Sequence, residues 1–290
     1  MKKILILSPG EMGAAVGNAL NQNGFEIFGI LNGRSEATRL RATSAGFRDV
    51  ETLKKGLEHA DIVFSILPPS KARSIATQVA ELMAGLTEKP PYVDCNAVSP
   101  ETAKEVASII NSEGAEAIDG GIVGNPPGAS PKPTRLFVSG PTAPIMDTFD
   151  GMGIAIKQCG PEIGQASAVK MVYAGVTKGV SALCANMLIA AERLGVGDIA
   201  YEEFQYSQEA LYRRMENLTP ALPAVSERYI GEMEEIAATC LSVNLSAGFH
   251  QGAADLYRLM ERSPFADEIR ETVDKERGLR ATIKGCSEVL

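Results

Sequence analysis

One segment near the N-terminus has the spacing of a phosphate-binding turn. Ser8-Pro9-Gly10-Glu11-Met12-Gly13 follows a short apolar run, Ile4–Leu7, and precedes a helical pattern. This is G-x-G-x-x-G with serine at the first glycine. The second glycine lets the main chain approach a pyrophosphate, the third lets the helix pack on the strand, and the helix start offers free N–H groups. We therefore predict that a dinucleotide contacts Pro9, Gly10, Glu11, Met12 and Gly13; a tight turn serving another ligand is the alternative.

A second candidate is Lys170, which lies among small and apolar residues in a proline-free segment spanning 162–194. Desolvation of a lysine there favours its neutral amine, which suits general acid–base chemistry. The alternative is a lysine whose head reaches solvent along its aliphatic stem. Together with a dinucleotide, Lys170 predicts proton transfer that accompanies hydride transfer.

The residues after the second predicted strand bear on which dinucleotide binds. NAD specificity usually rests on an Asp or Glu at this place, which accepts hydrogen bonds from the ribose hydroxyls. This chain has neutral Asn32, followed by Arg34 and Ser35. A guanidinium can hold a 2′-phosphate with paired hydrogen bonds. We therefore expect NADP as the cofactor, with NAD possible; the alternative is that Arg34 is a solvated loop residue.

The elements that must position these groups follow from the apolar pattern. Apolar runs alternate with helical patterns over the first 157 residues, which predicts an α/β fold, a doubly wound Rossmann-type parallel sheet. The expected strands are Ile4–Leu7, Phe25–Leu31, Ile62–Ile66, Tyr92–Cys95, Ala115–Ile118, Leu136–Ser139 and Ile154–Lys157. The expected helices are Glu11–Asn21, Ser35–Ala45, Thr52–Glu58, Lys71–Ala84 and Pro100–Asn111.

Beyond residue 160 the pattern is helical throughout. We expect a dinucleotide-binding domain over 1–160 and an all-helical substrate and dimerisation domain over 161–290, joined by a long helix at about 162–194. The apolar residues of this long helix occupy more than one face, which predicts that the helix is buried between other elements. Its Gly175 and Gly179 allow another backbone or a flat ligand to come close. We expect a homodimer through this domain. Further helices are expected at Tyr201–Glu216, Pro223–Ala238, Ala247–Glu261 and Ala266–Lys284.

Composition excludes several classes of function. The net charge of −8 argues against nucleic acid or an anionic membrane as partner, so we expect a small-molecule substrate. Five cysteines without a CxxC pair indicate reduced thiols and a cytoplasmic protein. Two distant histidines and no metal-ligand spacing predict no metal site. No segment is expected to span a bilayer.

Several motifs occur in the order found in one enzyme family. Besides the glycine turn and the proline loop at Leu67, Pro68 and Pro69, they are the segments 94–100, 119–124 and 160–170. In this order the chain resembles the β-hydroxyacid dehydrogenases, relatives of 6-phosphogluconate dehydrogenase, as a divergent member with an atypical helical C-terminal domain. The resemblance implies an NAD(P)-dependent dehydrogenase or reductase of the CH–OH class, with Lys170 as general acid and base.

The same resemblance implies which residues surround the ligands. Asn96 would border the nicotinamide and the substrate. The proline loop lies at the carboxyl edge of the predicted sheet, where ligands of this fold bind, so Leu67, Pro68 and Pro69 are expected to contact the cofactor; the alternative is that the loop serves to cap the next helix through Ser70. The substrate-binding stretch corresponds to Ile122, Val123, Gly124 and Asn125.

Four family positions differ in this chain and leave the substrate open, the first being Ala97, which replaces the Thr or Ser after Asn96. The usual serine is Val123, the second glycine is Asn125, and the asparagine one turn after the lysine is Ala174. Asn125, Tyr173 and Thr177 are candidate replacements, since Lys170, Tyr173 and Thr177 lie close to one helix face. The proline-rich segment 125–133 is either a stiff loop at the site mouth or a solvated surface loop. His250 either contacts substrate or serves as a capping or core histidine.

Three functions remain open from the sequence. The first is an NADP-dependent oxidoreductase that transfers hydride between nicotinamide and a small hydroxy acid or its oxo form. The second is an imine reductase of the same architecture; those enzymes commonly carry Asp or Tyr where Lys170 stands, and Tyr173 keeps this alternative open. The third is a non-catalytic NADP-binding protein.

Overall fold

The computed structural model describes residues 1–269, 272–274 and 276–290. The chain divides into two compact units, Met1–Met171 and Val172–Leu290, and each is described by itself. The division falls inside α6 (Gln165–Arg193), whose first turns belong to the first unit. The predicted domains, 1–160 and 161–290, remain a prediction.

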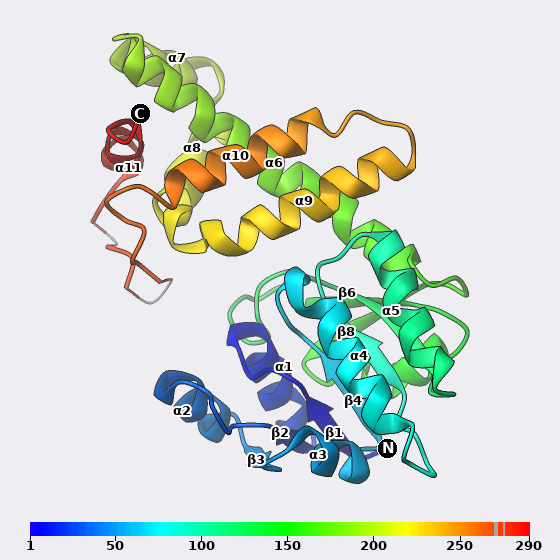
Figure 1. The fold of residues 1–290 in the computed structure, drawn as a ribbon. Coiled ribbons are helices and arrows are strands. Elements are labelled where there is room, and N and C mark those ends of the chain that lie inside the picture. Colours follow the sequence, from blue (N-terminus) through cyan, green and yellow to red (C-terminus); the bar gives the residue numbers. More distant parts are fainter. Residues whose placement is uncertain (270–271, 275) are drawn as a thin grey trace. The chain divides into compact units, whose positions relative to one another are not determined.

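The first unit is built on one eight-stranded sheet with the order β3-β2-β1-β4-β5-β6-β7-β8 (Figure 1). Neighbouring strands are parallel except β6 and β7, which are antiparallel. The first six strands have the order of a dinucleotide-binding fold, so the predicted α/β class is confirmed. The strands are β1 Lys3–Ile6, β2 Glu26–Gly29, β3 Phe47–Asp49, β4 Ile62–Ser65, β5 Tyr92–Asp94, β6 Ala117–Val123, β7 Thr134–Ser139 and β8 Ile154–Gly160.

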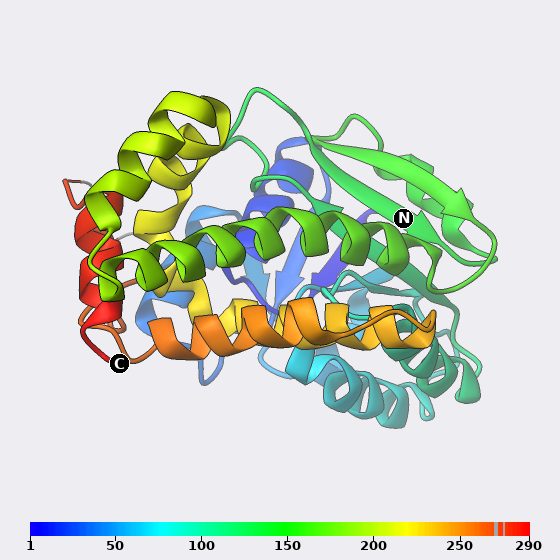
Figure 2. The same cartoon turned by 90° about the horizontal axis from the view of Figure 1, so that it is seen from above.

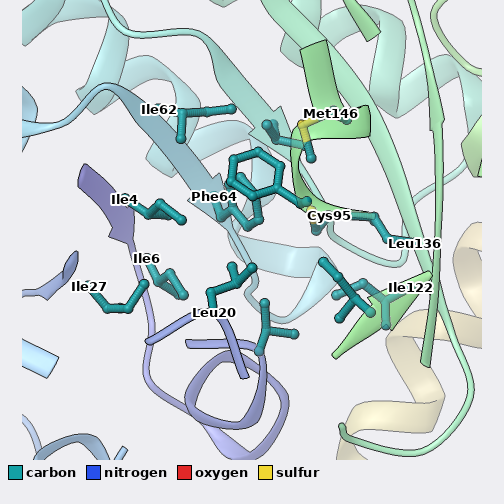
Figure 3. Packing of buried hydrophobic residues seen from close by; sticks show 14 of the residues in the cluster. Ile4, Ile6, Leu20, Ile27, Ile62, Phe64, Cys95, Ile122, Leu136 and Met146 are labelled. Carbon is teal, nitrogen blue, oxygen red and sulfur yellow. The ribbon is translucent and has the colours of Figure 1, made fainter. Parts of the chain in front are cut away.

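Two apolar clusters lie on the two faces of this sheet. One contains Ile4, Ile6 and Phe64 with residues of α1 and α2 (Figure 3), and the other contains Leu5 and Val63 with residues of α3, α4 and α5. Strands buried on both faces are apolar in consecutive positions, which explains the sequence pattern. The helices are α1 Glu11–Gln22, α2 Glu36–Ser44, α3 Leu53–His59, α4 Ala72–Met83 and α5 Pro100–Ser112.

Two features of the sheet differ from the sequence prediction. The three-residue strand β3 was not predicted, because only Phe47 of its residues is buried. The sheet is not parallel throughout, because β6 extends to Val123 and then reverses into β7 through the segment 124–133. That segment is therefore a hairpin connection.

The second unit is helical, as predicted. In it α9 and α10 pack against each other, and α10 (orange) runs beside α6 (green) in Figure 2. Its elements after α6 are α7 Gly197–Ser207, α8 Glu209–Leu218, α9 Ser226–Ser242, α10 Gly248–Met260 and α11 Leu279–Ser287, with short 3-10 turns at Thr219–Ala221 and Pro223–Val225.

Two predicted helices of this unit have the wrong extent. The segment 201–216 is two helices, because the chain leaves helical geometry at Gln208. The segment 266–284 is helical from Leu279, and residues 266–269, 272–274 and 276–278 before it are not helical; the Arg277 guanidinium donates to Glu268 and to the Pro220 carbonyl. Residues 270, 271 and 275 of this prediction lie outside the described residues.

The predicted burial of the long helix is wrong for the isolated chain. Val176, Leu183 and Met187 of α6 are 64%, 60% and 52% exposed. By length and composition alone, α6 could also cross a membrane, although core helices of soluble proteins meet the same criterion. This corrects the expectation that no segment approaches such a length.

Candidate active site

The turn between β1 and α1 has the geometry of a phosphate cradle. Gly10 is the N-cap of α1 and has no side chain with which to cap it, whereas the N-cap residues Ser35, Thr52 and Ser99 cap α2, α3 and α5 through their side chains. A Cβ on Gly13 would lie 2.1 Å from the Ser8 carbonyl oxygen, so only glycine allows this approach of helix and strand.

Space beside this turn is open where a pyrophosphate would lie. The nearest atom to a Cβ on Gly10 would be the Ser8 hydroxyl at 3.9 Å. Pro9 is buried within the turn, and Glu11 and Met12 are half-buried in the first turn of α1. The residues present therefore fit a dinucleotide phosphate. Glu11 is the acidic residue in the first turn of α1.

The predicted ribose-binding residues lie beyond the end of β2. Arg34 is exposed, and its Nη2 donates a hydrogen bond to the Leu7 carbonyl at 3.2 Å, which brings its guanidinium to the end of β1. Asn32 is also exposed, while Ser35 accepts the Thr38 N–H and so caps α2. These positions leave Arg34 available to a phosphate at the sheet edge.

A carboxylate that the sequence analysis missed lies next to the end of β2. Asp49, at the end of β3, accepts hydrogen bonds from the N–H groups of Leu31 and Glu51 at 3.2 and 2.9 Å. Its strand was not predicted, so only the tertiary pairing of β2 with β3 brings Asp49 there.

Asn96 ties together two loops at the carboxyl edge of the sheet. It is 2% exposed; its Oδ1 accepts the Leu67 N–H at 2.6 Å and its Nδ2 donates to Ser65 Oγ at 3.0 Å. Pro69 is buried and begins the short turn Pro69–Lys71, whereas Pro68 is exposed. Asn96 thus positions the proline loop, and its direct contact with a ligand stays a prediction.

The thiol beside Asn96 is not suited to nucleophilic chemistry. Burial of Cys95 raises the pKa of its thiol well above the usual range, and the nearby Asp94 and Asp119 carboxylates add to this. All five cysteines are free thiols, in agreement with the sequence prediction.

Lys170 is held against β6. Its Nζ donates a hydrogen bond to the Ile122 carbonyl oxygen at 2.6 Å, and the side chain is half-buried rather than fully desolvated. A Cβ on Gly121 would lie 2.9 Å from both Lys170 Cβ and the Ala166 carbonyl oxygen. Glycine at position 121 is therefore required for α6 to lie this close to the strand.

A buried carboxylate on the same strand holds the start of α6. Asp119 is 2% exposed, and its Oδ2 accepts the N–H groups of Gly164 and Ser167 at 2.9 and 3.0 Å. The Ser139 hydroxyl also donates to Oδ2 at 2.9 Å, and the Ser167 hydroxyl donates to Oδ1 at 2.6 Å. Sequence reasoning missed this role, although an aspartate directly before two glycines was visible.

The end of β6 carries the predicted substrate residues of the first unit. Ile122 and Val123 are buried, Gly124 has a φ of +116°, and Asn125 is exposed. The Thr134 hydroxyl donates to the Asn125 carbonyl at 2.6 Å and so closes the hairpin base.

Two predicted substrate residues belong to the second unit. Tyr173 is 47% exposed, and the Thr177 hydroxyl donates to the Tyr173 carbonyl at 2.9 Å along α6. Ala174, at the family's asparagine position, is buried. Tyr173 and Thr177 follow Lys170 in the same helix, α6, and the role of these residues in a common substrate face stays a prediction.

His250 packs against the two glycines of α6. Its Nε2 lies 3.3 Å from the Gly175 carbonyl oxygen and its Nδ1 3.8 Å from Cys240 Sγ. A Cβ on Gly175 or Gly179 would lie 3.2 or 3.5 Å from Nε2. The flat group beside these glycines is thus the half-buried imidazole of the same unit, and its role, substrate contact or capping and core packing, stays a prediction.

A groove of about 460 Å³ lies beside this imidazole between α6 and α10. Val176, Leu183 and Phe249 line it, and the Phe249 side chain is 85% exposed. Within residues 1–269, 272–274 and 276–290, no cluster of three His, Cys, Asp or Glu side chains could hold a metal ion.

Comparison with known proteins agrees with the glycine turn and the sheet order. The NAD binding domain of 6-phosphogluconate dehydrogenase matches residues 3–159, and a domain of unknown function matches residues 191–260. An uncharacterised 28.5 kDa protein of Methanothermus fervidus is 28% identical over 173 residues, 60% of this chain and 64% of the relative. The 3-hydroxyisobutyrate dehydrogenase of Pseudomonas aeruginosa is 25% identical over 203 residues, 68% of this chain and 63% of the relative.

Solved structures share the fold over nearly the whole chain. A conserved protein of unknown function, described as similar to 3-hydroxyacid dehydrogenases, has a TM-score of 0.65 at 26% identity over 89% of this chain and 96% of its own. The 3-hydroxyisobutyrate dehydrogenase of Mycobacterium tuberculosis with L-serine has a TM-score of 0.67 at 18% identity, over 98% of each chain. An imine reductase from Bacillus cereus has a TM-score of 0.56 at 17% identity, over 90% and 93%.

Proposed function

The chain belongs to the family defined by the NAD binding domain of 6-phosphogluconate dehydrogenase, and from this premise we propose that it is an NADP-dependent oxidoreductase acting on a small hydroxy acid or its oxo form. The observation that carries the proposal is the place of the Lys170 amine. It bonds Ile122 near the carboxyl end of β6. Because β1, β4, β5 and β6 are parallel, that end lies at the same sheet edge as the phosphate turn after β1.

Lys170 supplies the proton transfer in this proposal. A bound nicotinamide accepts or gives the hydride. During oxidation the neutral Lys170 amine takes the hydroxyl proton of the substrate, and during reduction the ammonium returns that proton to the carbonyl oxygen. The Ile122 carbonyl accepts one N–H of the Lys170 amine and so fixes the orientation of that amine.

Charge around the sheet edge supports NADP over NAD. Asn32 places no carboxylate after β2, and the exposed Arg34 reaches the end of β1. The Asp49 carboxylate is an argument for NAD, because a carboxylate near the ribose repels a 2′-phosphate, although its Oδ1 already accepts two N–H groups. We propose NADP as the preferred cofactor on the strength of Arg34.

Substrate binding is assigned to residues at the end of β6 and on α6. Ile122, Val123, Gly124 and Asn125 follow one another there, and Tyr173 and Thr177 lie one and two turns after Lys170. Asn96 contributes to this site by holding the proline loop through the Leu67 N–H. Because Val123 and Ala174 offer no hydrogen bond from the side chain, the polar contacts fall to Asn125, Tyr173 and Thr177.

The assembly and setting are further parts of the proposal. The exposed apolar side chains of α6 and α10 support a homodimer through the helical unit. Five free thiols support a cytoplasmic enzyme, and the net charge of −8 supports the absence of nucleic-acid or membrane partners.

Turnover assays of Lys170→Ala test the function. Purified protein is assayed with NADPH against a panel of 3-oxo acids and, separately, of cyclic imines. We expect reduction of an oxo acid, and a loss of about 10²–10⁴-fold in kcat for Lys170→Ala with unchanged NADPH affinity. Lys157→Ala, on an exposed position of β8, is the matched control. Near-normal turnover of Lys170→Ala contradicts the mechanism, imine reduction alone favours the imine reductase, and NADPH binding without any turnover favours a non-catalytic protein.

A further inference from the structure

Asp119 is a buried carboxylate, and three of its four hydrogen-bond donors lie at the start of the helix that carries Lys170; the fourth is the Ser139 hydroxyl of β7. Two main-chain N–H groups and two hydroxyls donate to it, and the N–H donors, from Gly164 and Ser167, lie at the start of α6. We propose that Asp119 is a positioning residue that sets the place of the Lys170 amine. The inference rests on the proposed function, in which that amine transfers the proton.

The start of a helix needs such acceptors. The first N–H groups of an α-helix have no partner within the helix, and a negative charge there is favoured by the helix dipole. Asp119 takes those of Gly164 and Ser167, and Ser139 Oγ takes that of Ala166 at 3.0 Å. The N–H groups of Gly164, which directly precedes α6, and of Ala166 and Ser167 in its first turn are thus fixed to β6 and β7.

Lys170 follows this fixed turn directly. Ser167 precedes it by three residues, so the two side chains lie on neighbouring parts of one helix face. Fixing the main chain at Ser167 fixes the direction of the Lys170 Cα–Cβ bond. The strand then holds both ends of the lysine, since Gly121 faces its Cβ and the Ile122 carbonyl accepts its Nζ.

The chemistry of the contacts requires a carboxylate at position 119. All four groups around it act as donors, and an ionised carboxylate is an acceptor with two oxygens. In Asp119→Asn the amide nitrogen would face at least one donor, either the Ser167 hydroxyl or the donors now on Oδ2. The shape is nearly unchanged, so the variant removes acceptors with little change in volume.

Chemical labelling of lysines tests the positioning without an enzyme assay. The holoprotein is treated with acetic anhydride, and the rate at each lysine is measured by mass spectrometry. In Asp119→Asn we expect Lys170 to react about tenfold faster than in the wild type, because its amine is no longer held on the Ile122 carbonyl, while Lys157 reacts unchanged. Thr52→Ala, which removes the cap of α3, should leave Lys170 unchanged.

Two results of this labelling overturn the proposal. They are an unchanged rate at Lys170 and an equal rise at every lysine, since the second is a general loosening. If Asp119→Asn does not fold, Ser167→Ala and Ser139→Ala each remove one hydroxyl contact, and a rise of about threefold at Lys170 is expected. No rise in either variant then overturns the proposal.

A double-mutant cycle separates positioning from general stability. Asp119→Asn should lower kcat about 30-fold, leave the KM for NADPH unchanged and shift the pH profile of kcat. In a Lys170→Ala background the same substitution should cost no further activity. Equal losses in both backgrounds overturn the proposal. Full activity of Lys170→Ala contradicts the proposed function instead. The labelling result then still tests whether Asp119 positions the Lys170 amine.

Discussion

The Nζ of Lys170 donates a hydrogen bond to the carbonyl oxygen of Ile122 at 2.6 Å, and this bond joins a helix to a strand 48 residues earlier in the chain. It relies on Gly121, where a side chain would meet the helix, and on Asp119, which holds the start of that helix. In β6, Asp119 therefore caps α6, Gly121 leaves room for that helix, and the Ile122 carbonyl binds the Lys170 amine. This segment is where changes should affect activity most.

Gly121→Ala should lower both stability and activity. Its Cβ would lie 2.9 Å from Lys170 Cβ and from the Ala166 carbonyl oxygen, so α6 must move away from the strand. We expect a loss of about 1–3 kcal/mol in the free energy of unfolding and at least tenfold in kcat. Gly85→Ala is the matched control, since only the Leu82 carbonyl oxygen lies within 4 Å of the added carbon, at 3.8 Å. Equal urea midpoints and turnover for the two variants would contradict the prediction.

Arg34→Ala should remove the preference for NADP. The lost guanidinium no longer pairs with a 2′-phosphate, so the Kd of NADPH should rise about 10- to 100-fold while that of NADH changes little. Isothermal titration with both cofactors measures this. Arg48→Ala, whose guanidinium pairs with Glu26, is the control and should not change either affinity. A wild-type preference for NADH would show that Asp49, not Arg34, governs the ribose.

Leu183→Lys should dissociate the proposed homodimer. Leu183 is 60% exposed on α6 and lines the groove with Phe249, so a charge there would be buried in a dimer contact. Sedimentation velocity should show a dimer for the wild type and a monomer for this variant at the same concentration. Leu40→Lys, at an equally exposed leucine of α2, should remain a dimer. A monomeric wild type, or a Leu183→Lys dimer, contradicts this interface.

Stability should fall at alkaline pH because of Cys95. Burial raises the pKa of its thiol well above the ordinary value of 9.0, so above pH 9 the unfolded chain releases a proton that the folded chain keeps. Fewer protons bound in the unfolded state mean that the free energy of unfolding decreases as pH rises, by up to about 1.4 kcal/mol per pH unit for this group. Below pH 9 the effect is absent.

Urea unfolding between pH 7.5 and 10.5 measures that slope. Cys95→Ala should show a smaller decrease than the wild type. Parallel curves for wild type and Cys95→Ala would assign the alkaline loss to other buried groups, such as Tyr92, where burial also raises the pKa.

Local pattern was enough to predict the elements that carry the chemistry. The glycine turn, α1 to α5 and the long helix with Lys170 were predicted within a few residues, because apolar spacing and turn residues act over one or two helical turns. The family order of motifs pointed to the same lysine. The sequence by itself thus determined the fold class, the phosphate turn and the candidate acid–base residue.

Contacts between distant segments were decided only by the tertiary structure. Asp119 and Gly164 are 45 residues apart, and nothing in either segment shows that a buried carboxylate caps α6. Likewise β3 exists through pairing with β2, and the Gly175–Gly179 surface is filled by His250 from α10. These features depend on which surfaces meet after folding, and the periodicity of one segment holds no information about its partner.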